Sequence, residues 1–269
     1  MNFKIVAVIV AVLIAAYAVL TFTLMQQEES VSNNAGMLGN GKDVSNIVTS
    51  SVEYADGING FLAKPAAAGK YPAIIMIHEW WGLNDNIKDM AKQMAAEGYV
   101  VLGVDLYNEV ATESMRAQEL SSNVRNNPEG AIQNMKSAVS FLRNHEMVKS
   151  DAIASLGWCF GGGWSLQLAL NEEMAATGIY YGSLVTDPAT LSVIKWPVLG
   201  IFGSEDGSIS VDRVRAFETA LNENNVENEI YVYDGVGHAF ANPSGANYAP
   251  EQTKDAWEKT VAFFDKHLK

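Results

Sequence analysis

The sequence predicts an α/β domain whose mostly parallel sheet carries helices on both faces, preceded by an N-terminal transmembrane helix. Two observations lead to this expectation. After about residue 47, short and continuously apolar runs alternate with amphipathic stretches of helix length. Ahead of them stands one uncharged apolar segment, Ile5–Met25, whose 21 residues are enough to cross a bilayer as a helix.

The charges around the apolar segment predict its orientation. Lys4 and the amino terminus precede it, and Glu28 and Glu29 follow it. This asymmetry favours a membrane anchor at residues 1–25 that holds the rest of the protein outside the cytoplasm. A cleaved signal peptide, which would give an exported protein, is the alternative, although its apolar region is usually shorter. Residues 26–46, rich in Ser, Asn, Gly and Glu, are expected to be a flexible linker.

Residues 47–269 are expected to form one α/β domain, which opens with a hairpin of Val48–Tyr54 and Asn59–Ala63 around Ala55-Asp56-Gly57. Apolar runs predict parallel strands at Ala73–Ile77, Tyr99–Val104, Ile153–Leu156, Ile179–Tyr181, Val198–Phe202 and Glu229–Tyr233. Helices are expected at Asn86–Glu97, Glu113–Val124, Gly130–Asn144, from about Gly162, Val211–Glu223 and Pro250–Lys266. In such sheets the functional site lies beyond the carboxyl ends of the strands.

Composition excludes several classes of function. The net charge of −13 argues against nucleic-acid binding, because phosphate contacts need a basic surface. One cysteine cannot form an intramolecular disulfide, and the sequence has no metal-ligand spacing, dinucleotide-binding glycine motif or P-loop. We therefore expect no cofactor and no metal, and a monomer that acts on a small molecule.

The candidate nucleophile lies in Gly157-Trp158-Cys159-Phe160-Gly161, between an expected strand and an expected helix. This G-x-C-x-G pattern is that of the nucleophile elbow, with cysteine in the place of serine. The close approach of strand and helix leaves no room for a Cβ at the two glycines, and the start of the helix favours a thiolate. A tight turn around a buried thiol is the alternative interpretation.

A base and an acid follow in the order that an elbow requires. His238 stands after the last expected strand and before the last helix, where the histidine of such a triad falls. Val198–Phe202 ends in Gly203-Ser204-Glu205-Asp206, so either Glu205 or Asp206 could orient the imidazole. From the residues alone, both acids could equally be solvated members of a turn.

The sequence resembles the dienelactone hydrolase family, which are α/β-hydrolases with a Cys-His-Asp triad. Three segments and the ending around the histidine carry the resemblance: His78–Asn84, Gly98–Tyr107, Gly157–Gly162 and Gly237–Phe240. The resemblance spans about Ile47 to the C-terminus. It implies an α/β-hydrolase-type sheet and a carboxylic ester or lactone hydrolase of the carboxymethylenebutenolidase class, with Asp206 as the acid.

The resemblance also implies roles for the residues of the site. Cys159 would attack the carbonyl of an ester or lactone, and His238, aligned by the acid, would carry the proton. Glu79 would lie beside the thiol and hold it unreactive until substrate binds, although a carboxylate after a strand could equally cap the next helix. The backbone N–H groups of Phe160 and Trp80 would form the oxyanion hole.

One position departs from the family pattern. Members that act on dienelactone carry an arginine four residues after the histidine, which pairs with the substrate carboxylate, whereas this chain has Asn242. Arg116 is the candidate for a second arginine of the pocket. Trp81 and Tyr181 are candidates for an apolar or aromatic pocket wall, as an alternative to core packing.

Two other functions stay open from the sequence. A thioesterase or acyl-transferase would use the same triad on a larger acyl substrate. A non-enzymatic binding domain of the cell envelope would keep the fold without the chemistry, and an intact set of Cys159, His238 and Asp206 argues against it.

Overall fold

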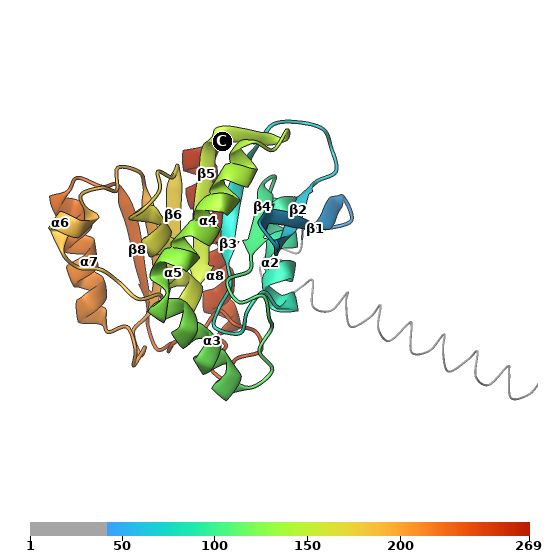
Figure 1. The fold of residues 1–269 in the computed structure, drawn as a ribbon. Coiled ribbons are helices and arrows are strands. Elements are labelled where there is room, and N and C mark those ends of the chain that lie inside the picture. The colour runs from blue at the N-terminus through green and yellow to red at the C-terminus, as the bar shows by residue number, and fades with distance from the viewer. Residues whose placement is uncertain (1–41) are drawn as a thin grey trace, which may run out of the picture.

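Tyr71–Ile77, the first wholly apolar strand candidate after the hairpin, forms a strand near the middle of an eight-stranded sheet (Figure 1). The computed structural model describes residues 42–269. The strands are β1 (Ile47–Ala55), β2 (Ile58–Pro65), β3 (Tyr71–Ile77), β4 (Val100–Val104), β5 (Val148–Trp158), β6 (Ala176–Tyr180), β7 (Val198–Gly203) and β8 (Asn228–Tyr233). The helices are α2 (Asp85–Ala96), α3 (Ser114–Asn126), α4 (Pro128–Arg143), α5 (Phe160–Ala169), α6 (Pro188–Leu191), α7 (Val211–Glu223) and α8 (Pro250–Leu268).

The strand order is β1-β2-β4-β3-β5-β6-β7-β8. The β1–β2 and β2–β4 pairs are antiparallel, and every later pair is parallel. The chain passes from β3 to β4 on one side and then returns to place β5 on the other side of β3, with Ile77 opposite Gly157. The connections diverge at the carboxyl ends of β3 and β5, and a sheet of this kind forms its site at such a point.

Each central strand is apolar on both faces because helices cover both faces of the sheet. In β3, Ile74 and Met76 pack in the layer of α2 and α8, whereas Ile75 and Ile77 pack in the layer of α4 and α5. Figure 1 shows α4 and α5 in front of the sheet and α8 behind it. The two cores hold the strand ends in a fixed relation to one another, and the site depends on that relation.

Element boundaries differ from the expected ones where tertiary pairing extends a strand. β5 begins at Val148, ahead of the apolar run, through a polar stretch that includes Lys149 and Asp151. Tyr71 of β3 pairs with Val148, and a register irregularity before Ala73 accommodates the extra residues. The four-residue helix α6 was not expected, because Pro188–Leu191 is too short to show a helical period.

The expected fold class is wrong in one part, the transmembrane helix. Among residues 42–269, no helix is both long enough and apolar enough to cross a bilayer. The longest, α8, has 19 residues and carries charged side chains such as Lys254 and Glu258 along one face. The helix expected over Ile5–Met25 lies outside the described residues. The fold class is therefore corrected to an α/β-hydrolase-like fold with a mostly parallel sheet, while the location outside the cytoplasm and the monomeric state stay predictions.

Candidate active site

Cys159 occupies the single residue between β5 and α5 and has a strained backbone. Its φ of 54° and ψ of −115° lie in a region that side chains with a Cβ rarely adopt. Such a conformation costs roughly 1–3 kcal/mol and persists where the surrounding structure enforces it. The backbone N–H of Cys159 donates to the carbonyl of Tyr180 at 3.0 Å, which ties the turn to β6.

Two glycines allow this turn. A Cβ on Gly157 would lie 2.1 Å from the carbonyl oxygen of Gly161, which is far inside any permitted contact. A Cβ on Gly161 would lie 2.2 Å from the carbonyl oxygen of Ile77 and 2.5 Å from that of His78. The first turn of α5 therefore rests on the carboxyl end of β3, and the Cys159 side chain is presented beside the loop that follows β3.

The structure brings Cys159, His238 and Asp206 together from three separate strand ends. His238, in the loop after β8, places Nε2 3.1 Å from the Cys159 Sγ. Its Nδ1 lies 2.7 Å from Oδ2 of Asp206, which follows β7. A carboxylate can only accept, so Nδ1 carries a proton and donates it toward Asp206. Nε2 is thereby left to exchange a proton with the sulfur.

The Asp206 carboxylate is fully buried and saturated with donors. Its Oδ1 accepts the backbone N–H groups of Ser208 at 2.7 Å and Ile209 at 3.0 Å. Burial alone would raise the pKa of Asp206, but the hydrogen bonds from His238 and from these two N–H groups lower it. Glu205, the other candidate acid, is exposed and makes no such contact with His238. Asp206 is thus held as an anion that orients the imidazole.

The same contacts set the charge of His238. Burial alone would lower the pKa of its imidazole, but the hydrogen bonds to Asp206 and Cys159 and their negative charges raise that pKa to about 10. The raised pKa favours the protonated imidazolium form of the ring at neutral pH. Tyr181 packs edge-on against the ring, with centroids 5.3 Å apart, and limits its rotation.

Glu79 is buried, and its carboxyl group bonds to Asn242. The residue is 3% exposed, its Oε2 accepts the side-chain N–H of Asn242, and its Oε1 has no hydrogen-bond partner among the described residues. Burial raises the pKa of Glu79 to about 7, against the lowering effect of Asn242 and His238. The structure therefore places the carboxyl near the site, with its hydrogen bond directed to an amide and not to the thiol.

A cavity of about 450 Å³ opens in front of the sulfur. Its lining residues come from the α3–α4 turn, from α5 and from the loops after β6, β7 and β8: Arg125, Pro128, Cys159, Phe160, Gly163, Trp164, Gln167, Tyr181, Ser183, Ser208, Ile209 and His238. Its size falls within the range of small-molecule pockets. The cavity can therefore present a small substrate to the Cys159 sulfur and the His238 imidazole.

Comparison with known proteins decides the family. The model of the dienelactone hydrolase family matches residues 58–268. This chain belongs to the dienelactone hydrolase family. It is 32% identical over 242 residues to a candidate carboxymethylenebutenolidase of Saccharolobus solfataricus, a match that covers 77% of this chain and 93% of that protein. It is 26% identical over 238 residues to a candidate 2-oxo-3-(5-oxofuran-2-ylidene)propanoate lactonase of a Bradyrhizobium species, over 82% of this chain and 96% of that protein.

A solved structure agrees with this assignment. The crystal structure of a candidate dienelactone hydrolase from Klebsiella pneumoniae matches this fold with a TM-score of 0.74 at 26% identity, over 82% of this chain and 99% of that chain. The expectation of a carboxylic ester or lactone hydrolase is thereby confirmed at the level of the dienelactone hydrolase family.

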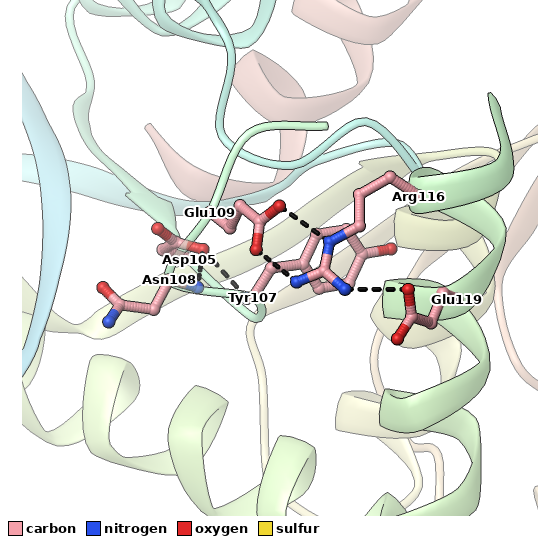
Figure 2. A network of polar contacts seen from close by, with 6 residues as sticks. All are labelled: Asp105, Tyr107, Asn108, Glu109, Arg116 and Glu119. Atoms are coloured by element: carbon pink, nitrogen blue, oxygen red, sulfur yellow. Dashed lines mark hydrogen bonds and ion pairs between the residues drawn. The ribbon is translucent and has the colours of Figure 1, made fainter. Parts of the chain in front are cut away.

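Arg116 lies outside the cavity. Figure 2 shows its guanidinium between two carboxylates, with Nε and Nη2 donating to Glu109 and Nη1 donating to Glu119. The distances are 2.8, 2.5 and 2.8 Å, so the donors that a substrate carboxylate would use are already occupied. Arg116 therefore fastens the start of α3 to the loop after β4.

The predicted aromatic wall is only partly present. Tyr181 lines the cavity, but Trp80 and Trp81 pack against each other and under α3, with ring centroids 5.0 Å apart. Phe160 and Trp164 of α5 supply the aromatic lining instead. Asn242 does not line the cavity, because its amide is turned toward Glu79.

Sequence reasoning missed Arg125. The residue is exposed, lines the cavity, and holds its guanidinium carbon 5.6 Å from the Phe160 ring centroid. No carboxylate within the described residues forms an ion pair with it. No local pattern separates Arg125 from Arg116, which lies nine positions earlier on the same helix. Only the packing of α3 against α4 decides which arginine lines the cavity that Cys159 also lines.

Proposed function

We propose that this dienelactone hydrolase cleaves a small ester or lactone through a thioester on Cys159, with His238 as proton carrier and Asp206 as its orienting anion. The observation that supports this proposal most is the contact of His238 Nε2 with Sγ at 3.1 Å, made while Nδ1 is held by Asp206 at 2.7 Å. Nucleophile, base and orienting acid in contact are the arrangement that covalent acyl transfer needs.

In the first step the thiolate of Cys159 attacks the carbonyl carbon, and the carbonyl π electrons move to the oxygen. Collapse of this tetrahedral intermediate expels the alkoxide, which takes the proton from His238 Nε2. The products are a thioester on Cys159 and an alcohol, which stays tethered to the acyl group when the substrate is a lactone. The raised pKa of His238 supports this step, because the ring holds the needed proton at neutral pH.

The second step returns the enzyme to its resting state. Water attacks the thioester while neutral His238 accepts one of its protons at Nε2. The second tetrahedral intermediate expels the thiolate and releases a carboxylic acid. The imidazolium and the thiolate then face each other again, so atoms and charge balance over the cycle.

We propose that both intermediates place their oxygen between the backbone N–H groups of Phe160 and Trp80. Phe160 begins α5, so its N–H is one of the free donors at the positive end of that helix. Trp80 follows the carboxyl end of β3, on which the first turn of α5 rests. The Trp80 N–H has no backbone acceptor among the described residues and is therefore available to an oxyanion.

The cavity supports a substrate that carries an anionic group as well as the scissile carbonyl. Arg125 supplies a positive charge to the cavity from α3, whereas Asn242 is a neutral amide that bonds to Glu79 and lies outside the cavity. The name of the Bradyrhizobium relative specifies a lactone that bears a carboxylate. We therefore propose a small lactone or ester with a carboxylate, which pairs with Arg125 while its carbonyl contacts Cys159.

The test is hydrolysis of a panel of small esters and lactones, each with and without a carboxylate, by the wild type and by Cys159→Ala. We expect turnover by the wild type and a loss of at least about 10³-fold in the variant. Intact-mass measurement on a slowly hydrolysed ester should show an acyl adduct that is lost in Cys159→Ala. Equal hydrolysis by the two proteins would overturn the proposed mechanism.

A further inference from the structure

We propose that His78 is a positioning residue for the oxyanion hole, because it holds the peptide unit that carries the Trp80 N–H. The inference rests on the proposed function, since it needs an oxyanion at that N–H. His78 directly follows β3 and is fully buried, yet neither the triad nor the cavity uses its side chain. Both of its ring nitrogens have backbone partners, one in each of two loops.

The first of these partners shows which ring nitrogen of His78 carries the proton. The Nδ1 of His78 lies 2.6 Å from the carbonyl oxygen of Glu79, which can only accept, so Nδ1 carries the proton. The second partner agrees with this tautomer, because the backbone N–H of Leu106 donates to Nε2 at 3.2 Å. Burial lowers the pKa of His78, which keeps the ring neutral and able to make both bonds.

The Leu106 donor is itself held in place. The neighbouring Asp105 donates its backbone N–H to the Tyr54 hydroxyl at 3.1 Å and accepts the Asn134 amide at 2.9 Å through its carbonyl. Its side chain caps the next turn, where Oδ1 accepts the backbone N–H groups of Tyr107 and Asn108, as Figure 2 shows. The loop after β4 is therefore a fixed support that selects the tautomer of His78.

The Glu79 carbonyl group belongs to the same peptide unit as the Trp80 N–H and connects it to His78. It accepts both the His78 Nδ1–H and the backbone N–H of Gly82, the latter at 3.2 Å. The peptide bond between Glu79 and Trp80 is not cis, so its N–H points opposite to its C=O. Two donors that fix the direction of the carbonyl therefore also fix the direction of the Trp80 N–H. An oxyanion donor must be aimed before the charge develops, which is the condition this arrangement meets.

Two substitutions of His78 test its two hydrogen bonds separately, because each removes one bond and keeps the other. In His78→Asn the side-chain amide nitrogen can take the place of Nδ1 and keep the bond to the Glu79 carbonyl. In His78→Gln the side-chain carbonyl can take the place of Nε2 and keep the bond from the Leu106 N–H. Each variant keeps one hydrogen bond of His78 and loses the other. Asparagine is the smaller of the two side chains, so a loss caused only by the cavity it leaves would be larger in His78→Asn, opposite to the order expected here.

Two rates are measured on each variant: ester turnover, and alkylation of Cys159 by iodoacetamide. Alkylation attacks a saturated carbon and forms no oxyanion, so it reports the nucleophile alone. We expect His78→Gln to lose about 10- to 100-fold in kcat with little change in KM. The Trp80 N–H would no longer point at the oxyanion, and the largest possible effect is that of removing this hydrogen-bond donor altogether. We expect His78→Asn to stay within about threefold of the wild type, and both variants to keep the wild-type alkylation rate and its pH profile.

Equal losses of kcat in the two variants, or a larger loss in His78→Asn, would overturn the proposal. A parallel fall in the alkylation rate would also overturn it, because that result marks a general structural defect. A measurement on the wild type keeps the proposal testable if a variant does not fold. Nitrogen-15 NMR of histidine-labelled protein should show one imidazole protonated at Nδ1 and not at Nε2 from pH 5 to 9, and the opposite tautomer at His78 would contradict the proposal. Failure of the proposed function would appear separately, as unchanged turnover in Cys159→Ala.

Discussion

Asn242 donates a hydrogen bond from its side-chain amide to Oε2 of Glu79 and so joins the loop after β8 to the carboxyl end of β3. The amide is neutral, so it cannot offset the charge that Glu79 would carry when ionised. Burial therefore dominates and raises the pKa of Glu79 to about 7. The Glu79 carboxyl group is thus largely protonated below neutral pH, a state that an arginine at position 242 would oppose.

The raised pKa of Glu79 should make the free energy of unfolding depend on pH. A group whose pKa is higher in the folded state stabilises the fold most below its unfolded pKa, and that contribution is lost as pH rises through the folded value. For Glu79 the window runs from about 4.5 to about 7. We expect the free energy of unfolding to fall across it by an amount on the order of 3 kcal/mol or less.

Urea unfolding at a series of pH values checks this expectation. Glu79→Gln removes the titrating group and should flatten the decline between pH 4.5 and 7. Glu205→Gln, at an exposed position, should keep the wild-type profile. The decline caused by His238 runs from pH 6.5 to about 10, so it overlaps the Glu79 window only between pH 6.5 and 7. An unchanged decline in Glu79→Gln would show that Glu79 does not titrate there.

Asn242→Arg should lower the pKa of Glu79, because it replaces the neutral amide that bonds to this carboxyl group with a positive charge. A guanidinium beside Glu79 favours the carboxylate, so the pKa of Glu79 should fall by about one unit or more. The pH profile of unfolding would then shift to lower pH, and Asn242→Gln, which stays neutral, should leave it in place. If the two variants give the same profile, the charge at position 242 does not control Glu79.

Arg125 and Arg116 provide a matched test of the substrate charge. Arg125 lines the cavity without a carboxylate partner among the described residues, whereas Arg116 is bonded to Glu109 and Glu119. We expect Arg125→Gln to raise KM about 10-fold or more for a carboxylate-bearing ester and to change KM little for its neutral analogue. Arg116→Gln should leave both KM values near those of the wild type. An equal change of KM for both esters in Arg125→Gln would show that Arg125 does not pair with the substrate carboxylate.

The two acids after β7 should differ sharply in their effect on turnover. Asp206→Asn keeps the size of the side chain but removes the anion that His238 donates to, and we expect kcat to fall by about 10²- to 10⁴-fold. Glu205→Gln should have near-normal kcat because Glu205 is exposed. Steady-state kinetics on one activated ester compares them, and a larger loss in Glu205→Gln would reassign the acid.

The close contact between α5 and β3 at Gly161 makes a prediction about stability. Gly161→Ala would force a Cβ to within 2.2 Å of the Ile77 carbonyl oxygen, so α5 and β3 would have to move apart. We expect destabilisation of about 3 kcal/mol or more, together with loss of activity. Gly207→Ala, where a Cβ meets nothing within 4 Å, is the control and should unfold like the wild type. Thermal melts of the two variants give the comparison.

Much of the site could be predicted from local sequence, because each part has a short signature. The apolar run of β3, the glycines around Cys159 and the place of His238 after the last strand each follow from backbone constraints that act within a few residues. The order of strands along the chain then requires that Cys159 and His238 meet at one edge of the sheet. The choice between Glu205 and Asp206 needed the family resemblance, because both stand in the same turn.

Contacts between segments that are far apart in the sequence have no short sequence signature. Arg125 and Arg116 share a helix and a residue type, and only the packing of α3 places one at the cavity that Cys159 lines and the other against Glu109. The partner of Glu79 stands 163 residues away in sequence, and the tautomer of His78 is selected by a loop 28 residues later. Amino-acid order by itself determined the α/β fold and the residue types at the proposed nucleophile and base, because both depend on local geometry. Tertiary structure alone decided the charge states and the direction of each side chain, because burial and hydrogen-bond partners arise only when separate strands meet.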